Sequence, residues 1–286
     1  MAPQARKRKQ IGSTHIIWLI ILLFMMLMIL VPIYVMFKYS ISDRTSIVTG
    51  GKYPTPIWPF KPDFVQYEEL LGRTDFLAAG LYSLEIALLT VALSLLIGVP
   101  AAFALSRYKF PGLVILMFPI VAIRLFPDIC SVIPVAEAFA KPPLSLIAPF
   151  FQVAMAHTLL SLPYVIYICI GVFKMIPKEL EEQAYILGAS KFYAFRHVIV
   201  PVSLTGVAAA AIYVFLLSWN EFIFAYFLLF KSPNVSLPVY LLRILTWTPQ
   251  LNFLAAISMI LSFPVIIFSF AVQRYMITGM TAGAVK

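Results

Sequence analysis

Six long apolar runs dominate this chain of 286 residues, and they constrain its fold more than any other feature. The first run, Ile16 to Phe37, holds no charged residue and would span roughly 33 Å as a helix, which is enough to cross a bilayer. The other runs cover residues of about 77–105, 112–136, 146–173, 201–230 and 253–277. The sequence therefore predicts an all-α, polytopic membrane protein with six transmembrane helices.

Composition supports this fold class, since 62% of the residues are hydrophobic and only 12% are charged. A water-soluble core of ordinary proportions cannot hide that much apolar surface, so membrane lipid is the expected surrounding. The net charge of +9 follows the positive-inside rule, and we expect no nucleic-acid partner. Cys130 and Cys169 lie inside apolar runs without metal-ligand spacing, which predicts no metal site and no disulfide.

Basic residues predict the orientation in the membrane. Residues 6–9 are Arg and Lys, and the run behind them is too long for a signal-peptide core and lacks a small-residue cleavage site, so we expect a retained anchor. With the N-terminus inside, the predicted cytoplasmic segments carry more Lys and Arg than the external ones, and six crossings place both termini in the cytoplasm. The expected order is a basic tail, a first transmembrane helix, an external loop rich in proline and aromatic residues, a transmembrane core and a cytoplasmic tail. These parts cover residues 1–15, 16–39, 40–75, 76–278 and 279–286.

A polar stretch, residues 177–200, separates the fourth apolar run from the fifth. It opens on Pro177 and three glutamates, which suit the positive end of a helix dipole, and continues with an apolar stripe at helical spacing. The glutamates and the stripe are Glu179, Glu181, Glu182, Leu180, Ala184 and Leu187. Gly188 can end this helix in the left-handed conformation, and Ser190 can cap a second helix whose apolar face holds Phe192, Phe195 and Ile199. The pattern predicts a cytoplasmic hairpin of two short helices.

Two interpretations of this hairpin differ in what it contacts. An amphipathic segment between membrane spans often lies flat on the bilayer surface, where Lys and Arg on its polar face meet anionic lipid. Here three glutamates open the segment, and anionic lipid would repel them. We therefore expect the hairpin to fit a socket on a partner protein.

Four motifs resemble the smaller permease subunit of maltose-type carbohydrate ABC importers. Glu182-Gln183-Ala184, with Gly188-Ala189 and Pro201, is similar to the EAA loop of these permeases. The other matching segments are residues 102–112, Trp219-Asn220-Glu221-Phe222 and the tail 279–286, so the resemblance covers nearly the whole chain. The sequence departs from the family at Gln183, usually alanine, and at Leu187, usually aspartate. Tyr82 replaces an asparagine common before Ser83.

The resemblance implies a permease that moves a sugar or sugar derivative across the cell inner membrane by alternating access. No catalysis and no cofactor are implied for this chain, because ATP and Mg²⁺ belong to the partner ATPase. The implied partners are a homologous second permease, two ATPase subunits and an extracytoplasmic solute-binding protein. The hairpin would act as a coupling helix docked on the ATPase through Glu181, Glu182, Ala184, Leu187, Gly188, Ala189 and Phe192. A Gly-rich tail would reach the ATPase dimer through Gly279, Thr281 and Gly283.

Polar side chains inside the predicted spans are candidates for a substrate path, because each is expensive to bury in lipid. The candidates are Arg124, Asp128, Trp219, Asn220, Glu221 and Phe222, the last four by resemblance. Arg124 and Asp128 are four residues apart, so they either satisfy each other or line the path, where Arg124 would favour an anionic sugar. Glu85 and His157 are expected to form interhelical hydrogen bonds. Trp219, Phe222, Tyr164 and Tyr167 either stack on sugar rings or serve as packing residues.

Two other classes of protein fit the sequence less well than an importer permease does. A secondary, ion-coupled transporter usually shows an internal repeat, and the two halves of this sequence show none. A membrane-embedded enzyme needs a converging set of catalytic residues, and His157 with scattered carboxylates supplies neither a nucleophile nor metal-ligand spacing.

Overall fold

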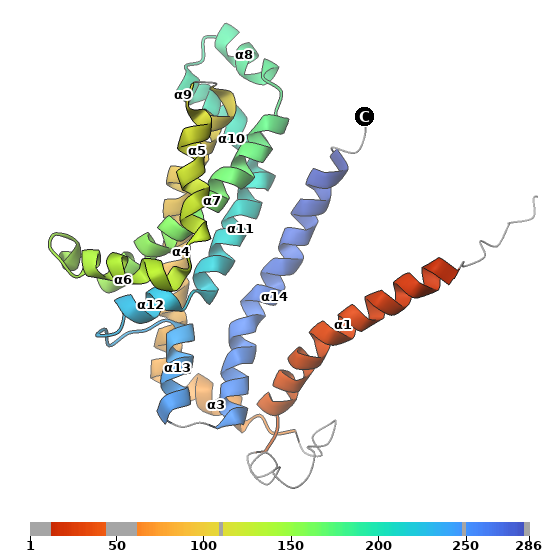
Figure 1. Ribbon diagram of the computed structural model, residues 1–286, viewed down its shortest axis with the longest axis vertical. Helices are drawn as coiled ribbons and strands as arrows, with labels where there is room; N and C mark the ends of the chain where they lie inside the picture. The colour runs from red at the N-terminus through yellow and green to blue at the C-terminus, as the bar shows by residue number, and fades with distance from the viewer. Residues whose placement is uncertain (1–12, 44–61, 109–110, 248–249, 283–286) are drawn as a thin grey trace, which may run out of the picture. The chain divides into compact units, whose positions relative to one another are not determined.

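The computed structural model describes residues 13–43, 62–108, 111–247 and 250–282, and the regular secondary structure in these ranges is helical, with one isolated bridge between Ser42 and Pro62 (Figure 1). The chain divides into two compact units. One comprises Met1–Leu70 with Thr248–Ile260, and the other comprises Leu71–Trp247 with Leu261–Lys286. Within the described residues four helices are long and apolar enough to cross a membrane, or five if one bent pair counts as a single span.

The first unit contains α1 (Ser13–Ser40), most of α3 (Val65–Gly72) and the start of α14 (Leu251–Ala282). The chain after α1 is tied to the start of α3, because the Asp63 N–H donates to the Ile41 carbonyl at 2.8 Å and the Tyr67 hydroxyl donates to Ser40 Oγ at 2.7 Å. These contacts order the two ends of the predicted external loop. Its proline- and aromatic-rich middle, residues 44–61, and the basic tail 1–12 lie outside the described residues.

Three long helices form the centre of the second unit, and their contacts show how they run. These helices are α4 (Thr74–Arg107), α7 (Pro149–Met175) and α11 (Leu204–Asn220). Ser94 of α4 hydrogen-bonds Ser161 of α7 at 2.6 Å, and one turn further Gly98 lies against Val165, so α4 and α7 are parallel. Gly206 near the start of α11 faces Val172 near the end of α7, so α11 runs antiparallel to them.

These helices pack closely because small residues stand at the contacts. A Cβ atom added to Gly98 would lie 2.6 Å from Val165, and one added to Gly206 would lie 2.3 Å from Val172. Small residues of this kind let transmembrane helices approach through van der Waals contact. The surrounding core consists of Val99, Ala102, Val165, Ile166, Cys169, Ile170, Phe173, Ile176, Ile199, Val207, Ala210 and Val214.

The segment between α4 and α7 carries the chain back from one end of this helix pair to the other. It consists of α5 (Leu113–Ala122), the 3-10 turn η2 (Ile123–Leu125), α6 (Asp128–Phe139) and the 3-10 turn η3 (Leu144–Leu146). The apolar run 112–136 is thus broken rather than one continuous helix. Pro127 accounts for the break, because a residue before proline is disfavoured in the helical region, and Phe126 is extended with φ −77° and ψ 136°.

The run 201–230 is also interrupted. The α11 helix ends at Asn220, and α12 (Ile223–Leu228) begins after two non-helical residues, of which Glu221 is extended. The short α12 packs against α6 and α7 around Val132, Phe139, Ala156, Leu160 and Phe224. Further along, α13 (Leu237–Trp247) is tied to α4 by the Leu237 N–H, which donates to Ser83 Oγ at 2.7 Å.

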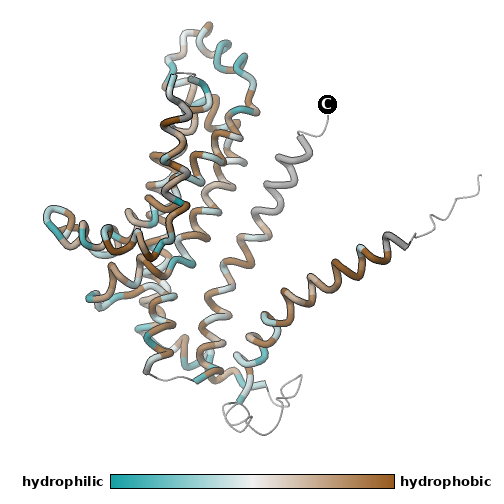
Figure 2. Tube along the Cα trace, viewed as in Figure 1, coloured by the Kyte–Doolittle hydropathy of each residue, from teal (hydrophilic) through white to brown (hydrophobic). Residues whose placement is uncertain are grey.

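The polar stretch 177–200 forms helical pieces at one end of the α4–α7–α11 bundle, where Figure 2 shows hydrophilic colouring. They are α8 (Glu179–Ile186), α9 (Lys191–Ala194), a π-helical turn η4 (Phe195–Ile199) and α10 (Val200–Val202). The axis bends by 78° between Lys191–Val202 and Leu204–Asn220. Pro201 accounts for the irregular backbone before the bend, because it has no N–H to donate and its ring crowds the preceding turn.

Candidate functional site

The α8–α9 hairpin turns at Gly188, which has φ +84°, the left-handed conformation that a glycine adopts without steric cost. The Ala189 N–H returns to the Ala184 carbonyl at 3.0 Å and closes the end of α8. Ser190 caps α9, since its hydroxyl accepts a hydrogen bond from the Tyr193 N–H at 3.2 Å. The first helix begins at Glu179, two residues later than the predicted start at Pro177.

The tip of the hairpin is apolar and exposed. The side chains of Ile186, Leu187 and Phe192 project outward, and Leu187 is 87% exposed. Ala184 is buried on the inner side of α8, so the predicted apolar stripe through Ala184 and Leu187 does not lie on one face. An exposed apolar patch of this kind marks a contact with another protein or with the membrane.

An ion pair anchors the base of the hairpin to α4. The Arg107 guanidinium at the end of α4 pairs with the Glu181 carboxylate in the first turn of α8 and also donates to the Ile176 carbonyl at 3.0 Å. Glu181 was expected on the partner-facing surface, and the structure instead places it inward, because Arg107 lies beneath α8. Burial, followed by the negative charge of Glu181, raises the pKa of Tyr185.

One polar cluster in the helical core forms at the break between α5 and α6. Arg124 Nη1 donates to Asp128 Oδ1 at 3.0 Å, so these two candidates do satisfy each other. The guanidinium carbon also lies 5.5 Å from the ring centroid of Tyr164, and that ring lies 5.0 Å from the ring of Tyr213. Both charged side chains keep part of their surface exposed, so the cluster offers a paired charge beside two aromatic rings.

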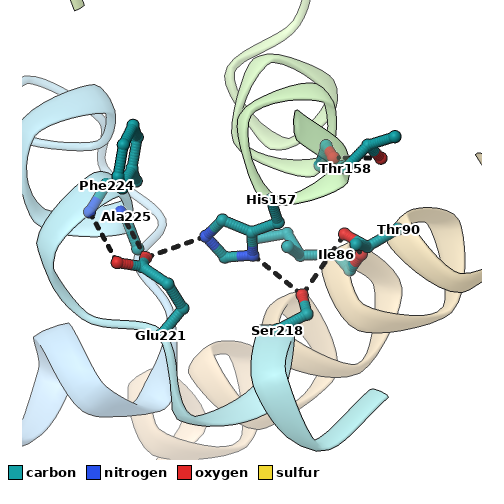
Figure 3. Close-up of polar contacts among 9 residues, drawn as sticks. Ile86, Thr90, His157, Thr158, Ser218, Glu221, Phe224 and Ala225 are labelled. Carbon is teal, nitrogen blue, oxygen red and sulfur yellow. Dashed lines mark hydrogen bonds and ion pairs between the residues drawn. The ribbon is translucent and has the colours of Figure 1, made fainter. Parts of the chain in front are cut away.

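A second, buried polar cluster forms at the break between α11 and α12 (Figure 3). His157 of α7 lies 2.8 Å from Ser218 Oγ through Nδ1 and 2.8 Å from Glu221 Oε2 through Nε2. The Glu221 carboxylate also accepts the N–H groups of Phe224 at 2.9 Å and Ala225 at 3.0 Å, which caps α12. The sequence predicted an interhelical bond for His157 but not that Glu221 would be its partner.

The other predicted path residues lie apart from these clusters. Trp219 is buried, and its indole N–H donates to the Leu261 carbonyl at 3.0 Å. Asn220 donates to the Leu216 carbonyl of its own helix, and Phe222 stacks on Tyr226 with 5.6 Å between ring centroids. Glu85 is exposed, in contrast to the interhelical hydrogen bond expected for it.

A cavity of about 80 Å³ lies beside the Arg124–Asp128 pair. Arg124, Asp128 and Phe224 are among the residues that line it. The backbone N–H of Phe224 donates to the Glu221 carboxylate. Pockets that hold drug-sized ligands measure roughly 300–1,000 Å³, so this cavity alone does not enclose a sugar. Within the described residues no group of three or more His, Cys, Asp or Glu is arranged to hold a metal ion.

The residues of the predicted C-terminal contact are only partly described. Gly279 and Thr281 belong to the helical backbone of α14, which continues to Ala282, and Gly283 lies outside the described residues. The predicted tail therefore starts as helix.

Long apolar helices and an ordered polar hairpin with an exposed apolar tip define a polytopic membrane protein. Sequence comparison identifies the family. The family model that matches residues 87–281 is described as the binding-protein-dependent transport system inner membrane component. The chain belongs to this family, which makes it a transport component rather than an enzyme. This confirms the resemblance to importer permeases drawn from the motifs.

Individual relatives agree with this assignment. The chain is 29% identical over 263 residues to the trehalose transport system permease protein SugB of Mycobacterium tuberculosis (strain CDC 1551 / Oshkosh), a match that covers 90% of this chain and 92% of the relative. It is 33% identical over 225 residues to the osmoprotective compounds uptake permease protein GgtD of Synechocystis sp. (strain ATCC 27184 / PCC 6803 / Kazusa), covering 77% of this chain and 74% of that one.

A solved structure shares the fold. One chain of a bacterial ABC transporter involved in the import of the acidic polysaccharide alginate superposes with a TM-score of 0.70, covering 95% of this chain and 99% of that chain. At 22% sequence identity this likeness concerns the fold alone.

Proposed function

We propose that this chain is the permease subunit of an ATP-driven ABC importer that moves a sugar or sugar derivative across the inner membrane by alternating access. The observation that carries the proposal is the hairpin with an outward apolar tip, anchored through Arg107 to a long helix of a chain in the binding-protein-dependent transport family. The names of relatives specify trehalose, alpha-glucoside and diacetylchitobiose transport, which supports a carbohydrate substrate.

In this proposal the hairpin is the coupling helix that docks on an ATPase subunit. Leu187 and Phe192 supply the apolar contact, Glu182 supplies a charge, and Gly188 with Ala189 sets the turn, while Ala184 packs the inner side. Glu181 takes a different role from the one first expected, because it holds the hairpin on Arg107. A hairpin that is anchored rigidly transmits rigid-body motion from the ATPase to the transmembrane helices.

We further propose six membrane crossings with both termini in the cytoplasm. The crossing that brings the number from five to six is the broken segment α5–η2–α6, the third along the chain. It returns the chain from the end of α4 to the start of α7. The complete importer then contains a homologous second permease, two ATPase subunits that bind ATP and Mg²⁺, and an extracytoplasmic solute-binding protein. The tail from Gly279 through Thr281 to Gly283 would add a second contact with the ATPase dimer.

The substrate path in this subunit would pass the Arg124–Asp128 pair, because broken transmembrane helices in transporters line solute cavities. The pair carries no net charge, and Tyr164 beside it supplies a flat apolar ring, so the surface has the polar and apolar groups that a sugar needs. Trp219 and Glu221 are occupied by internal contacts and would shape the path without touching substrate. Asn220 and Phe222 remain proposed path residues.

A photo-crosslinking experiment tests the coupling role. A photoreactive amino acid at Leu187 should crosslink to the co-purified ATPase. The same amino acid at Leu146 should not, because Leu146 is 84% exposed but precedes the start of α7, at the end of this helix opposite the hairpin. Reconstituted vesicles should then take up sugar only with ATP on the ATPase side. Equal crosslinking at both positions, or uptake that follows an ion gradient without ATP, would refute the proposal. The ion-coupled alternative has no support from the family or the relatives.

A further inference from the structure

The hydrogen bonds in the buried cluster of Figure 3 have determined directions. The Ile86 carbonyl can only accept, so Thr90 Oγ1, 2.7 Å away, donates to it. Thr90 therefore accepts from the Ser218 hydroxyl at 3.2 Å. The single proton of Ser218 is used in that bond, so Ser218 Oγ must accept from His157, and Nδ1 of His157 carries a proton.

The second ring nitrogen faces a carboxylate that is already stabilised as an anion. Glu221 accepts two backbone N–H groups, from Phe224 and Ala225, and hydrogen bonds of this kind favour the ionised form of a carboxyl group. An ionised carboxylate offers no proton, so Nε2 of His157 must donate to Glu221 Oε2 across 2.8 Å. Both ring nitrogens then carry protons, which makes the side chain an imidazolium.

We propose that His157 is a positioning residue, held as an imidazolium in the membrane, whose pairing with Glu221 clamps α4, α7, α11 and α12 into one unit that moves rigidly during transport. The pair has no net charge, which is the condition for keeping ionised groups inside a membrane protein. His157 is 1% exposed and Glu221 9% in their side chains, so neither exchanges its partner for water. The part of this inference that concerns transport rests on the proposed function.

The His157–Glu221 pair lies at the break between α11 and α12, next to the proposed substrate path. Glu221 ends α11 and caps α12, and α12 packs on α6, the helix that begins with Asp128. Fixing Glu221 through His157 therefore fixes the wall of the cavity that Arg124 and Asp128 line. The hydrogen-bond partners of His157 in the described structure are Ser218 and Glu221. Other charged or titratable groups on α7 and the elements packed against it are Asp75, Tyr82, Glu85, Arg107, Arg124, Asp128, Cys130, Glu137, Tyr164, Tyr167, Cys169, Lys174, Tyr213 and Tyr226.

Nitrogen-15 NMR of histidine-labelled protein in the purified, assembled complex tests the protonation state without any transport measurement. His157→Gln identifies the His157 signals by their disappearance. At neutral pH we expect two protonated ring nitrogens. One protonated and one bare nitrogen would overturn the inference, whatever substrate the complex carries.

Sugar uptake by reconstituted variants tests the clamp. His157→Leu leaves the buried Glu221 carboxylate without a cation, and we expect uptake to fall by at least about tenfold. His157→Leu/Glu221→Gln removes the unpaired charge as well, and uptake should return to within about threefold of wild type. Thr158→Val is the matched control, because Thr158 is buried next along α7 and its hydroxyl, in the described structure, donates to the Ala154 carbonyl of its own helix. If the double variant takes up sugar no faster than His157→Leu, the charge of His157 is not what matters, and His157 is a packing residue. If wild-type complex imports no sugar, the proposed function fails, and the NMR result still decides the protonation state.

Discussion

The ion pair between Arg107 and Glu181 makes a quantitative prediction about the hairpin. Arg107 is the last residue of α4, and its guanidinium holds both the Glu181 carboxylate and the Ile176 carbonyl, on either side of the connection into α8. Replacing Arg107 with Met keeps an unbranched apolar stem but removes the ion-pair partner of Glu181. The base of the hairpin should then open more often, while the transmembrane helices stay folded.

The size of the effect follows from burial. Removing one partner of a buried ion pair costs about 3–5 kcal/mol. The side chains of Arg107 and Glu181 are 8% and 10% exposed and lie at a helix end, so we take the lower value of about 3 kcal/mol. Since 1.4 kcal/mol corresponds to a factor of ten, the open population of the hairpin should rise about 150-fold. The double variant Arg107→Met/Glu181→Leu leaves no unpaired carboxylate and loses only the hydrogen bond to Ile176. The open population of its hairpin should therefore rise only about fivefold to tenfold.

Amide hydrogen exchange of the purified complex, followed by mass spectrometry, measures this opening in peptides of α8. Lys174→Met is the control, because it removes an exposed cation from the last turn of α7 and should leave exchange unchanged. The reasoning fails if Arg107→Met exchanges like wild type, or if the double variant opens as far as the single one. Either result would mean that the hairpin is held by packing and not by the ion pair.

Three further predictions follow from the structure. Gly206→Ala forces a methyl group to about 2.3 Å from a branched side chain of α7, which should cost about 1–3 kcal/mol and lower Tm by about 2–5 °C, while Gly171→Ala, with no atom within 4 Å, should leave Tm unchanged. Gly188→Ala places a side chain at φ +84°, at a cost of about 1 kcal/mol, and should reduce the ATPase that co-purifies with the chain; unchanged recovery would argue against a rigid turn. Asp128→Asn frees the charge of Arg124 and should lower the uptake KM for anionic sugars relative to neutral ones, whereas Arg124→Gln should raise it; equal changes for both sugar classes would exclude a substrate contact.

Much of the helical content could be read from the sequence because its signals are local. Apolar length predicted α1, α4, α7 and α14 nearly to their ends, and the glycine and serine of the hairpin predicted the turn at Gly188 and the cap at Ser190. The breaks beside Pro127 and Pro201 also have local causes, but hydropathy alone does not reveal them, since prolines are common in membrane helices and Pro100 and Pro163 lie inside unbroken ones.

The partners of the polar residues required the tertiary structure. The one short-range pair, Arg124 with Asp128, was foreseeable because four residues make one helical turn. Glu181 meets Arg107 across 74 residues, and His157 meets Glu221 across 64, and no periodicity in the sequence brings these side chains together. They meet because α4 and α7 run parallel while α11 runs antiparallel, with close contacts at Gly98 and Gly206. By itself the sequence determined a helical membrane chain with a polar hairpin, since bilayer crossing and turn formation depend on neighbouring residues. Only the packing of distant helices decided which charges pair, because a buried charge is stable where the fold supplies its partner.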